Sequence, residues 1–309
     1  IAAALLHDVV EDTGVPIEAL RKEFGEEVAT LVEGVTKMDK IHFESKEDYN
    51  AENIRKIVLA MSKDFRVILI KLVDRLHNMK TLRYFKPEKQ KRIAEETKEI
   101  YVPIAHKLGI YKIKGLLEDL CLRYLEPKVY KMLSQKISEK RTEREKHADE
   151  IISIVKNALK QKGVEADVYG RAKYFYSIYK KMKKKNIDFD QVYDLVALRI
   201  VTKTIPDCYA ALGAVHDLWK PIPNRFKDYI SVPKSNGYQS LHTTLVTKQG
   251  RILEVQIRTE KMHYYAEEGV AAHWRYQGTE RDKQFDQRIH WLKQVLDWKL
   301  NSADAKDFI

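Results

Sequence analysis

The spacing of apolar residues changes near Gly163, and this change constrains the fold more than any other feature of the sequence. Before Gly163, apolar residues recur every three or four positions, as in Leu69, Leu72, Val73 and Leu76, which predicts helices. We therefore expect a multidomain chain in which an all-α domain precedes an α+β domain with a mixed sheet. Four segments after Gly163 have the apolar pattern of strands: 164–170, 193–201, 240–247 and 251–258.

Glycine and proline mark the helix limits. Residues 1–12 are expected to form one helix that ends at Thr13-Gly14, and Pro16 begins the next helix. A helical repeat is also present at 54–61. Further helices are expected near 174–186, 206–219 and 259–275.

The length of the chain and a charged segment in its middle predict the domain limits. At about 150 residues per domain, 309 residues make about two domains. Residues 137–150 hold nine charges in fourteen positions, which is typical of a solvated helix between domains. We expect a first domain at 1–125, a helical connector at 126–160 and a second domain at 161–309. With 44% apolar residues, the chain can bury a sizeable core.

Charge and cysteine usage narrow the partners and the compartment. The net charge of +11 favours nucleotides, nucleic acid or a membrane surface. Cys121 and Cys208 do not make a disulfide framework or a Cys-based zinc site, and they fit a cytoplasmic location. No apolar run reaches the ~18 residues of a membrane span, and residues 1–6 do not resemble a signal peptide. Because the chain starts without Met inside a predicted helix, we expect it to be a fragment.

Four polar residues crowd one part of the predicted first helix. His7, Asp8, Glu11 and Asp12 are related by spacings of three and four positions. Their neighbours, such as Val9, are apolar, and three unpaired carboxylates on a partly buried helix would need a cation. A metal site and an acidic helix end facing solvent both fit this pattern, although acids there oppose the helix dipole.

Asp74 is a candidate ligand on a second helix. It shares a helix face with Asn78, and His77 shares one with Thr81. A lone Asp on a helix is more often a cap or an ion-pair partner. A His-Asp pair followed much later by an Asp nevertheless resembles the HD phosphohydrolase superfamily. A set of nitrogen and oxygen ligands suits Mn²⁺ or Fe²⁺ and argues against a zinc site with sulfur ligands.

Residues 171–185 hold seven Lys and Arg and no acid. Arg171, Lys173, Ser177 and Lys181 form a cationic stripe that enters a helix N-terminus, which suits a polyphosphate. A solvated basic face and a nucleic-acid patch fit the same charges.

The last predicted strand has one polar face. Its apolar residues at 253, 255 and 257 point to one side, and Glu254, Gln256 and Arg258 point to the other. Asp194 opens the adjacent strand and, with Glu254, is a candidate for holding Mg²⁺ between nucleotide phosphates. An exposed edge strand would alternate in the same way.

The loop at 231–242 combines a cation, a turn, an aromatic ring and an imidazole. Lys234 and Asn236 precede Tyr238, and His242 follows. Tyr238 is a candidate for stacking on a purine, although a lone tyrosine is more often a packing residue.

Seven motifs resemble those of the long RelA/SpoT-type bifunctional (p)ppGpp synthetase/hydrolases, in their N-terminal catalytic region. The intact HDxxED is similar to members that retain hydrolase activity, and Arg225-Phe226-Lys227-Asp228 is similar to the basic R-x-K-D form of bifunctional members. The motifs run in order over essentially the whole chain: HDxxED, DRLHNMKTL, GRAKYFYSIYKKM, YDLVALRI, RFKDYISVPKSNGYQSLHT, LEVQIRT and AEEGVAAHW.

This resemblance implies an HD-type (p)ppGpp hydrolase domain at 1–125, truncated at its N-terminus, and a nucleotidyltransferase-like synthetase domain at 161–309. The synthetase would move pyrophosphate from ATP to the 3′-OH of GDP or GTP, and the hydrolase would remove it, as in the stringent response. The partners would be ATP, GDP or GTP and (p)ppGpp, with no membrane. Ribosome or tRNA contact would need regulatory domains that this chain does not contain.

For the hydrolase, the resemblance implies that Mn²⁺ is held by His7, Asp8, Asp74 and an upstream His that this chain does not contain. Glu11 and Asp12 would serve as acid and base. The nucleotide would contact Asn78 and Thr81.

For the synthetase, the resemblance implies that Asp194 and Glu254 handle Mg²⁺ and that Glu254 deprotonates the 3′-OH. Tyr238 would stack on guanine. The nucleotides would be held by a larger set of residues: Arg171, Lys173, Ser177, Lys181, Arg225, Lys227, Lys234, Asn236, Tyr238, His242 and Gln256.

Two other classes fit parts of the pattern. An HD phosphohydrolase fused to a template-directed nucleotidyltransferase would usually show Gly-Ser followed by Asp-x-Asp, which this chain lacks. An RNA-binding module built on the basic stripe would not need Asp194 and Glu254 near the cations.

Overall fold

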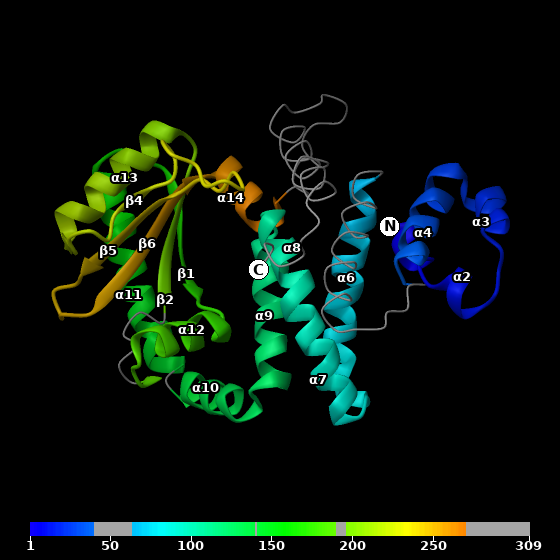
Figure 1. Cartoon of the computed structure of the whole chain (residues 1–309). Coiled ribbons are helices and arrows are strands. Elements are labelled where there is room, and N and C mark those ends of the chain that lie inside the picture. The colour runs from blue at the N-terminus through cyan, green and yellow to red at the C-terminus, as the bar shows by residue number, and fades with distance from the viewer. Residues whose placement is uncertain (40–63, 140, 190–195, 270–309) are drawn as a thin grey trace, which may run out of the picture. The chain divides into compact units, whose positions relative to one another are not determined.

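The computed structural model describes residues 1–39, 64–139, 141–189 and 196–269, and the chain divides into two compact units (Figure 1). Residues 1–105 belong to the first unit, and residues 106–272 form the second. Within the described ranges, no helix is long and apolar enough to cross a membrane. The helical repeat expected at 54–61 and the predicted site residue Asp194 lie outside the described residues.

The first unit is helical throughout its described residues, as expected. Its core lies where α3, α4 and α6 meet and includes Leu20, Val32, Val35 and Val67. The elements are α1 (Ala2–Leu5), α2 (Val9–Asp12), α3 (Ile17–Phe24), α4 (Glu26–Asp39), α6 (Phe65–Thr81), the 3₁₀ helix η1 (Leu82–Tyr84), α7 (Pro87–Glu96), the π-helix η2 (Thr97–Tyr101) and α8 (Val102–Lys107), which continues into the second unit.

The single helix expected over 1–12 is wrong, because the chain turns between α1 and α2. The side-chain Nδ1 of His7 lies 2.8 Å from the Ala4 carbonyl oxygen. In a continuous helix, that carbonyl would accept from the backbone N–H of Asp8. A side chain that competes for a backbone acceptor favours a turn, and here the turn places His7 and Asp8 between the two helices.

The second unit combines helices with a mixed sheet, which confirms the α+β prediction. The strand order is β1-β2-β6-β5-β3, with β4 also paired to β5. Strands β2 and β6 are parallel, and the other pairs are antiparallel. The elements are α9 (Tyr111–Leu125), α10 (Pro127–Glu139), α11 (Arg141–Gln161), β1 (Ala166–Ala172), α12 (Phe175–Lys185), β2 (Val196–Thr202), α13 (Ile205–Leu218), β3 (Lys220–Pro221), β4 (Lys227–Asp228), β5 (Leu241–Val246), β6 (Ile252–Thr259) and α14 (Glu260–Glu268).

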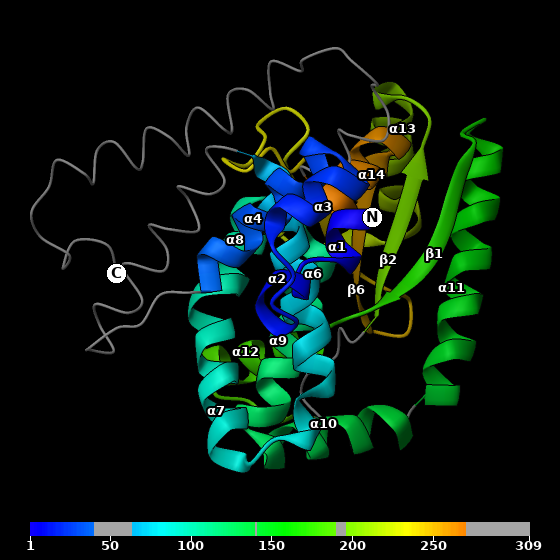
Figure 2. The ribbon, with the colours of Figure 1, turned by 90° about the vertical axis from the view of Figure 1, so that its right-hand side faces the viewer.

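Helices α11 and α13 cover the apolar face of this sheet. Val155 of α11 and Val215 of α13 are buried together with Val255 and Ile257 of β6. Figure 2 shows α11 running beside β1. The opposite face of β6 therefore carries the polar residues, as the alternation predicts.

Within the described residues, the first unit ends at residue 105, whereas the sequence analysis expected the first domain to end at residue 125. Residues 106–125 group with the second unit, and α11 packs on the sheet through Ile151, Val155 and Leu159. The segment at 126–160 thus contributes to a core rather than only bridging two domains. As functional domain limits, the ranges 1–125, 126–160 and 161–309 stay a prediction.

Candidate active sites

Three side chains of the first unit form a group that is able to hold a metal ion. Nε2 of His7 lies 3.1 Å from Oδ2 of Asp8 and 3.4 Å from Oδ1 of Asp74. One ligand atom from each of the three residues lies within 4.8 Å of the others. The turn between α1 and α2 supplies His7 and Asp8, and α6 supplies Asp74.

The histidine of this group turns its Nε2 atom toward the two carboxylates. A carbonyl oxygen only accepts hydrogen bonds, so Nδ1 of His7 donates to the Ala4 carbonyl oxygen. Nε2 is buried and makes no hydrogen bond within the described residues. One ring nitrogen and two carboxylates make a ligand set that suits a shared cation, and a backbone carbonyl on the other ring nitrogen is typical of metal-binding histidines. The three residues therefore fit a divalent metal.

Asp74 has two further partners on its own helix. The amide of Asn78 donates a 2.9 Å hydrogen bond to Asp74 Oδ1, and Nζ of Lys71 lies 3.7 Å from Oδ2. Lys71 is only 4% exposed, and the sequence analysis did not single it out. Lys71 precedes Asp74 by three positions on a predicted helix, and this spacing could have indicated the ion pair. Burial raises the pKa of Asp8, and His7 opposes that shift.

Of the other predicted hydrolase residues, Glu11, Asp12 and Asn78 are exposed and Thr81 is half-buried. Glu11 and Asp12 lie on α2, and their carboxylates are not among the three clustered ligand atoms. Asn78 and Thr81 lie near the C-terminal end of α6, where the Thr81 hydroxyl donates to the His77 carbonyl oxygen at 3.2 Å. Of the four crowded side chains that the sequence predicts, His7 and Asp8 join Asp74 in the metal-type group, and the charge of Asp12 adds to the rise in the pKa of Asp8 that burial causes.

The second candidate site lies on the polar face of the sheet. Nζ of Lys173, between β1 and α12, donates a 2.7 Å hydrogen bond to Oε2 of Glu254 on β6. Because residues in register share a face, Gln256 stands between Arg199 of β2 and His242 of β5. The predicted pairing of Asp194 with Glu254 lies outside the described residues.

The sequence predicts a phosphate site at the N-terminus of α12, but in the structure a carboxylate contacts this end of the helix. Asp119 of α9 accepts a 2.8 Å hydrogen bond from the backbone N–H of Tyr176, in the first turn of α12. Burial raises the pKa of Asp119 to about 6, although backbone hydrogen bonds from Tyr176 and Phe175 act in the other direction. A carboxylate from a distant helix thus caps the amides that an anion would use.

The cationic stripe itself is spread over several elements. Arg171 lies at the end of β1, with its guanidinium 5.3 Å from the centre of the Tyr174 ring. Ser177 is exposed and Lys181 is half-buried on α12. These residues border the Lys173–Glu254 pair in sequence.

A buried charge cluster at β2, β6 and α14 was missed by the sequence analysis. Oε1 of Glu267 lies 2.9 Å from Nη1 of Arg199 and 3.1 Å from Nη2 of Arg258. Arg199 and Arg258 are 4% and 1% exposed. Burial raises the pKa of Glu267, but the nearby arginines, first Arg199, outweigh this and hold it below its usual value. An arginine inside an otherwise apolar strand, as in Arg199, was the available signal.

The loop at 231–242 brings its predicted residues together. The hydroxyl of Tyr238 lies 2.8 Å from Nε2 of His242, and Nζ of Lys234 lies 5.2 Å from the centre of the Tyr238 ring. Gly237, with φ of 72°, allows its N–H to donate to the Lys234 carbonyl oxygen. Burial, and then the charge of Lys234, lower the pKa of His242 to about 4, so its imidazole is neutral near pH 7.

The R-x-K-D motif has exposed cations and an anchored acid. Arg225 and Lys227 are exposed, and Lys227 is in register with His242. Asp228 accepts hydrogen bonds from the Tyr209 hydroxyl and from the Ser231 backbone N–H, both at 2.9 Å. The carboxylate therefore shapes the loop, while the two cations face solvent.

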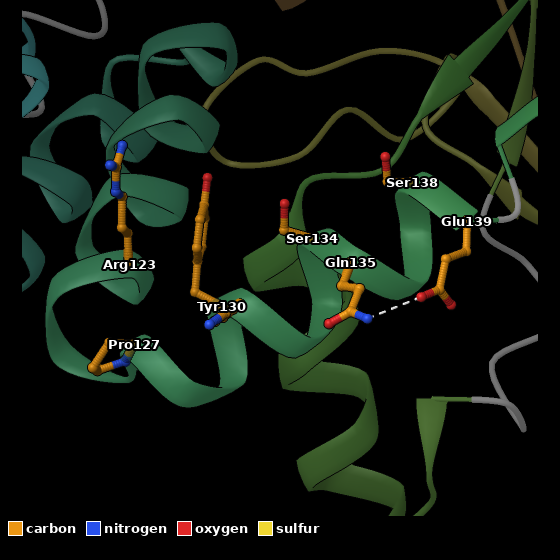
Figure 3. A pocket seen from close by; sticks show the side chains of 8 residues that line it. Arg123, Pro127, Tyr130, Ser134, Gln135, Ser138 and Glu139 are labelled. Carbon is orange, nitrogen blue, oxygen red and sulfur yellow. Dashed lines mark hydrogen bonds between the residues drawn. The ribbon is translucent and has the colours of Figure 1, made fainter.

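A pocket lies on α9 and α10, where Tyr130 of its lining meets the ring of Phe175 on α12. Figure 3 shows its lining, in which the Gln135 amide donates a 3.0 Å hydrogen bond to Glu139. It contains none of the predicted site residues. Its lining consists of Arg123, Pro127, Tyr130, Lys131, Ser134, Gln135, Ser138 and Glu139.

Comparison with known proteins identifies two regions in the chain. Residues 1–111 match the model of the HD domain, and residues 170–281 match the model described as the region found in RelA / SpoT proteins. The metal-type group therefore falls in the first match, and the polar sheet face falls in the second.

Curated relatives align with the whole chain. A Synechocystis protein named probable guanosine-3′,5′-bis(diphosphate) 3′-pyrophosphohydrolase is 49% identical over 315 residues, covering 100% of this chain and 41% of the relative. The GTP pyrophosphokinase of Myxococcus xanthus is 48% identical over 313 residues, with the same coverage of both chains. The chain thus spans about two fifths of the length of these relatives.

Among solved structures, the small alarmone synthetase 1 from Bacillus subtilis, bound to its product pppGpp, is 21% identical to the chain. The superposition covers 52% of this chain and 95% of that chain, with a TM-score of 0.36.

Proposed function

Because the chain belongs to the RelA/SpoT family, we propose that it is a bifunctional alarmone enzyme with two separate active sites. One site transfers pyrophosphate from ATP to the 3′-OH of GDP or GTP, and the other hydrolyses (p)ppGpp to GDP or GTP and pyrophosphate. The observation that carries this proposal is that one chain holds both a metal-type group, His7 with Asp8 and Asp74, and a polar sheet face with the Lys173–Glu254 pair.

In the hydrolase site, His7, Asp8 and Asp74 hold Mn²⁺, which when bound makes a water molecule nucleophilic at neutral pH. The Asn78 amide, 2.9 Å from Asp74 Oδ1, fixes the orientation of that carboxylate. Glu11 and Asp12, which are exposed on α2, exchange the protons of the reaction with solvent. Asn78 and Thr81 contact the nucleotide.

In the synthetase site, Glu254 accepts the proton of the 3′-OH and, with Asp194, holds Mg²⁺, which when bound neutralises phosphate charge. The Lys173 ammonium, 2.7 Å from Glu254, orients the carboxylate. The ATP phosphates are held by a basic set: Arg171, Lys173, Ser177, Lys181, Arg225 and Lys227.

The guanine nucleotide occupies the side of the face formed by the 231–242 loop. Tyr238 stacks on the base. Lys234 contacts phosphate by charge. Because the pKa of His242 is lowered to about 4, this residue contacts phosphate as a neutral hydrogen-bonding group. Asn236 and Gln256 supply the remaining polar contacts.

The setting of these reactions follows from their substrates. ATP, GDP or GTP and (p)ppGpp are the partners, and the enzyme works in the cytoplasm, where these nucleotides are found.

The test of both activities is product analysis. With ATP, GDP and Mg²⁺, chromatography is expected to detect AMP and a guanosine 3′-pyrophosphate product. With that product and Mn²⁺, it is expected to detect GDP and pyrophosphate. If the folded chain forms neither set of products but binds bulk RNA, the RNA-binding alternative replaces this proposal.

A further inference from the structure

The short segment at 106–111 lies directly against the loop that carries Tyr238. The side-chain amide of Asn236 donates a 3.2 Å hydrogen bond to the His106 carbonyl oxygen and a second hydrogen bond to the Tyr111 hydroxyl. The rings of Tyr111 and Tyr238 meet edge to face, with centroids 5.4 Å apart and an interplanar angle of 71°. All of these residues belong to the second unit.

The other side of this segment is fixed by the end of α14. A Cβ atom on Gly269 would lie 2.5 Å from the Leu108 carbonyl oxygen and 2.6 Å from the Gly109 carbonyl carbon. Backbone therefore approaches backbone there at a distance that only glycine permits. Leu108 and Ile110, on either side of Gly109, are 2% and 3% exposed. The segment is thus an anchored support and not a loose connection.

Asn236 links the two tyrosines. Its Oδ1 accepts a 3.3 Å hydrogen bond from the backbone N–H of Tyr238, while its Nδ2 donates to Tyr111. A second ring, that of Tyr229, meets Tyr238 at 6.2 Å. The ring of Tyr238 is therefore oriented by neighbours on the loop and by Tyr111, which is distant in sequence.

We infer that Tyr111 is a positioning residue of the guanine-nucleotide pocket, holding the Tyr238 ring and Asn236 in the geometry that a purine base needs. This inference rests on the proposed synthetase function. Tyr111 lies outside residues 170–281, which match the RelA / SpoT region, and it is the last residue of the HD match at 1–111. The pocket is thus completed by a residue from outside the matched synthetase region.

A ring fixed before the base arrives loses less freedom on binding, so removal of Tyr111 is expected to weaken guanine nucleotide specifically. For Tyr111→Ala, the loss of one aromatic pair corresponds to a rise in the GDP Kd and KM of about two- to tenfold, with the ATP KM unchanged. Tyr111→Phe keeps the ring and loses only the hydroxyl, so it is expected to restore most of the affinity. Tyr84→Ala, at an exposed tyrosine of the first unit, is the matched control.

The experiment combines GDP titration by calorimetry with hydrogen exchange of the 234–242 backbone in the three variants and the wild type. We expect faster exchange of this loop and weaker GDP binding in Tyr111→Ala alone, with Tm close to wild type. Equal loop exchange in Tyr111→Ala and wild type, or an equal rise of the ATP and GDP KM values, would overturn the inference. If Tyr111→Ala does not fold, Tyr111→Leu, which keeps an apolar side chain of similar reach, is measured in the same way. Failure of the wild type to bind GDP would instead refute the synthetase assignment, while loop exchange would still decide whether Tyr111 positions Tyr238.

Discussion

The ammonium of Lys173 lies 2.7 Å from the carboxylate of Glu254, although the two residues are 81 positions apart in the chain. Lys173 follows β1, and Glu254 lies on β6, on the face opposite the apolar core. The pair is half-buried, which distinguishes it from the exposed Lys203–Glu165 pair at 2.8 Å. Partly buried ion pairs are screened less than exposed ones, so the charge of Glu254 is expected to matter for function.

The first prediction concerns Glu254. Glu254→Gln keeps the size of the side chain but removes its charge and its ability to accept a proton. Pyrophosphate transfer is expected to fall by at least about a hundredfold, with the ATP Kd changed little. Synthesis rates and ATP titration measure this. Glu165→Gln, which breaks the exposed pair, is expected to behave as wild type, and transfer that persists in Glu254→Gln would remove Glu254 from the chemistry.

The second prediction concerns Asp74. Asp74→Asn replaces a carboxylate by an amide, which is a poor ligand for a hard cation, so Mn²⁺ binding and (p)ppGpp hydrolysis are expected to be lost. Synthesis is expected to continue, because Asp74 belongs to the first unit. Calorimetric Mn²⁺ titration is a readout independent of activity. The exposed Asp217→Asn serves as the matched control, and Mn²⁺ affinity equal to wild type in Asp74→Asn would show that Asp74 is not a ligand.

The third prediction concerns Tyr238. Tyr238→Ala is expected to weaken guanine nucleotide binding by about 1–3 kcal/mol, the usual contribution of base–aromatic stacking. Tyr238→Phe retains the ring and loses only the 2.8 Å contact with His242, so its effect is expected to be smaller. Separate titrations with GDP and ATP measure the difference. An increase in the ATP Kd with unchanged GDP affinity would mean that the two nucleotide pockets are assigned in reverse.

The fourth prediction concerns the carboxylate that caps α12. Because burial raises the pKa of Asp119 to about 6 from 3.8, the native state binds a proton that the unfolded state has released between these pH values. This residue therefore makes the wild type less stable as pH rises from about 4 to 6. Asp119→Asn keeps an oxygen acceptor for the Tyr176 N–H and does not titrate.

The measurement is the Tm of wild type and Asp119→Asn across this range. The Tm of the variant minus that of wild type is expected to rise with pH and to level off above about pH 6. The pKa of His242 is lowered to about 4, so this residue makes the native state more stable as pH rises over the same range. Because both proteins contain His242, its effect cancels in the difference between their Tm values. A difference that is constant with pH would mean that Asp119 keeps an ordinary pKa.

The local spacing of apolar residues predicted those helices and strands that are long enough to show a period. The alternation of Leu253, Val255 and Ile257 with polar residues predicted both the strand and the face that it buries, and the structure confirms this. The break after Leu6 was not predictable from periodicity, because the residues there keep a helical spacing, whereas in the structure the His7 side chain contacts the Ala4 carbonyl oxygen. Strands β3 and β4 have two residues each, too few to show a period.

The contacts that shape the two candidate sites were the least visible in the sequence. Asp119 reaches the α12 amides, Glu267 reaches Arg199, and Tyr111 reaches Tyr238, each from a distant element. Such pairs leave no local spacing to detect. The types of residue in the sites were apparent from motifs, whereas the partners that orient those residues required the fold.

The most direct test of the account follows labelled pyrophosphate from ATP through both reactions in Asp74→Asn and Glu254→Gln. Asp74→Asn is expected to build labelled (p)ppGpp from ATP and GDP with Mg²⁺ and to release none of it with Mn²⁺. Glu254→Gln is expected to build none and to release pyrophosphate from supplied (p)ppGpp at the wild-type rate. If either folded variant loses both activities, the two reactions are not carried by separate sites, and the account is contradicted.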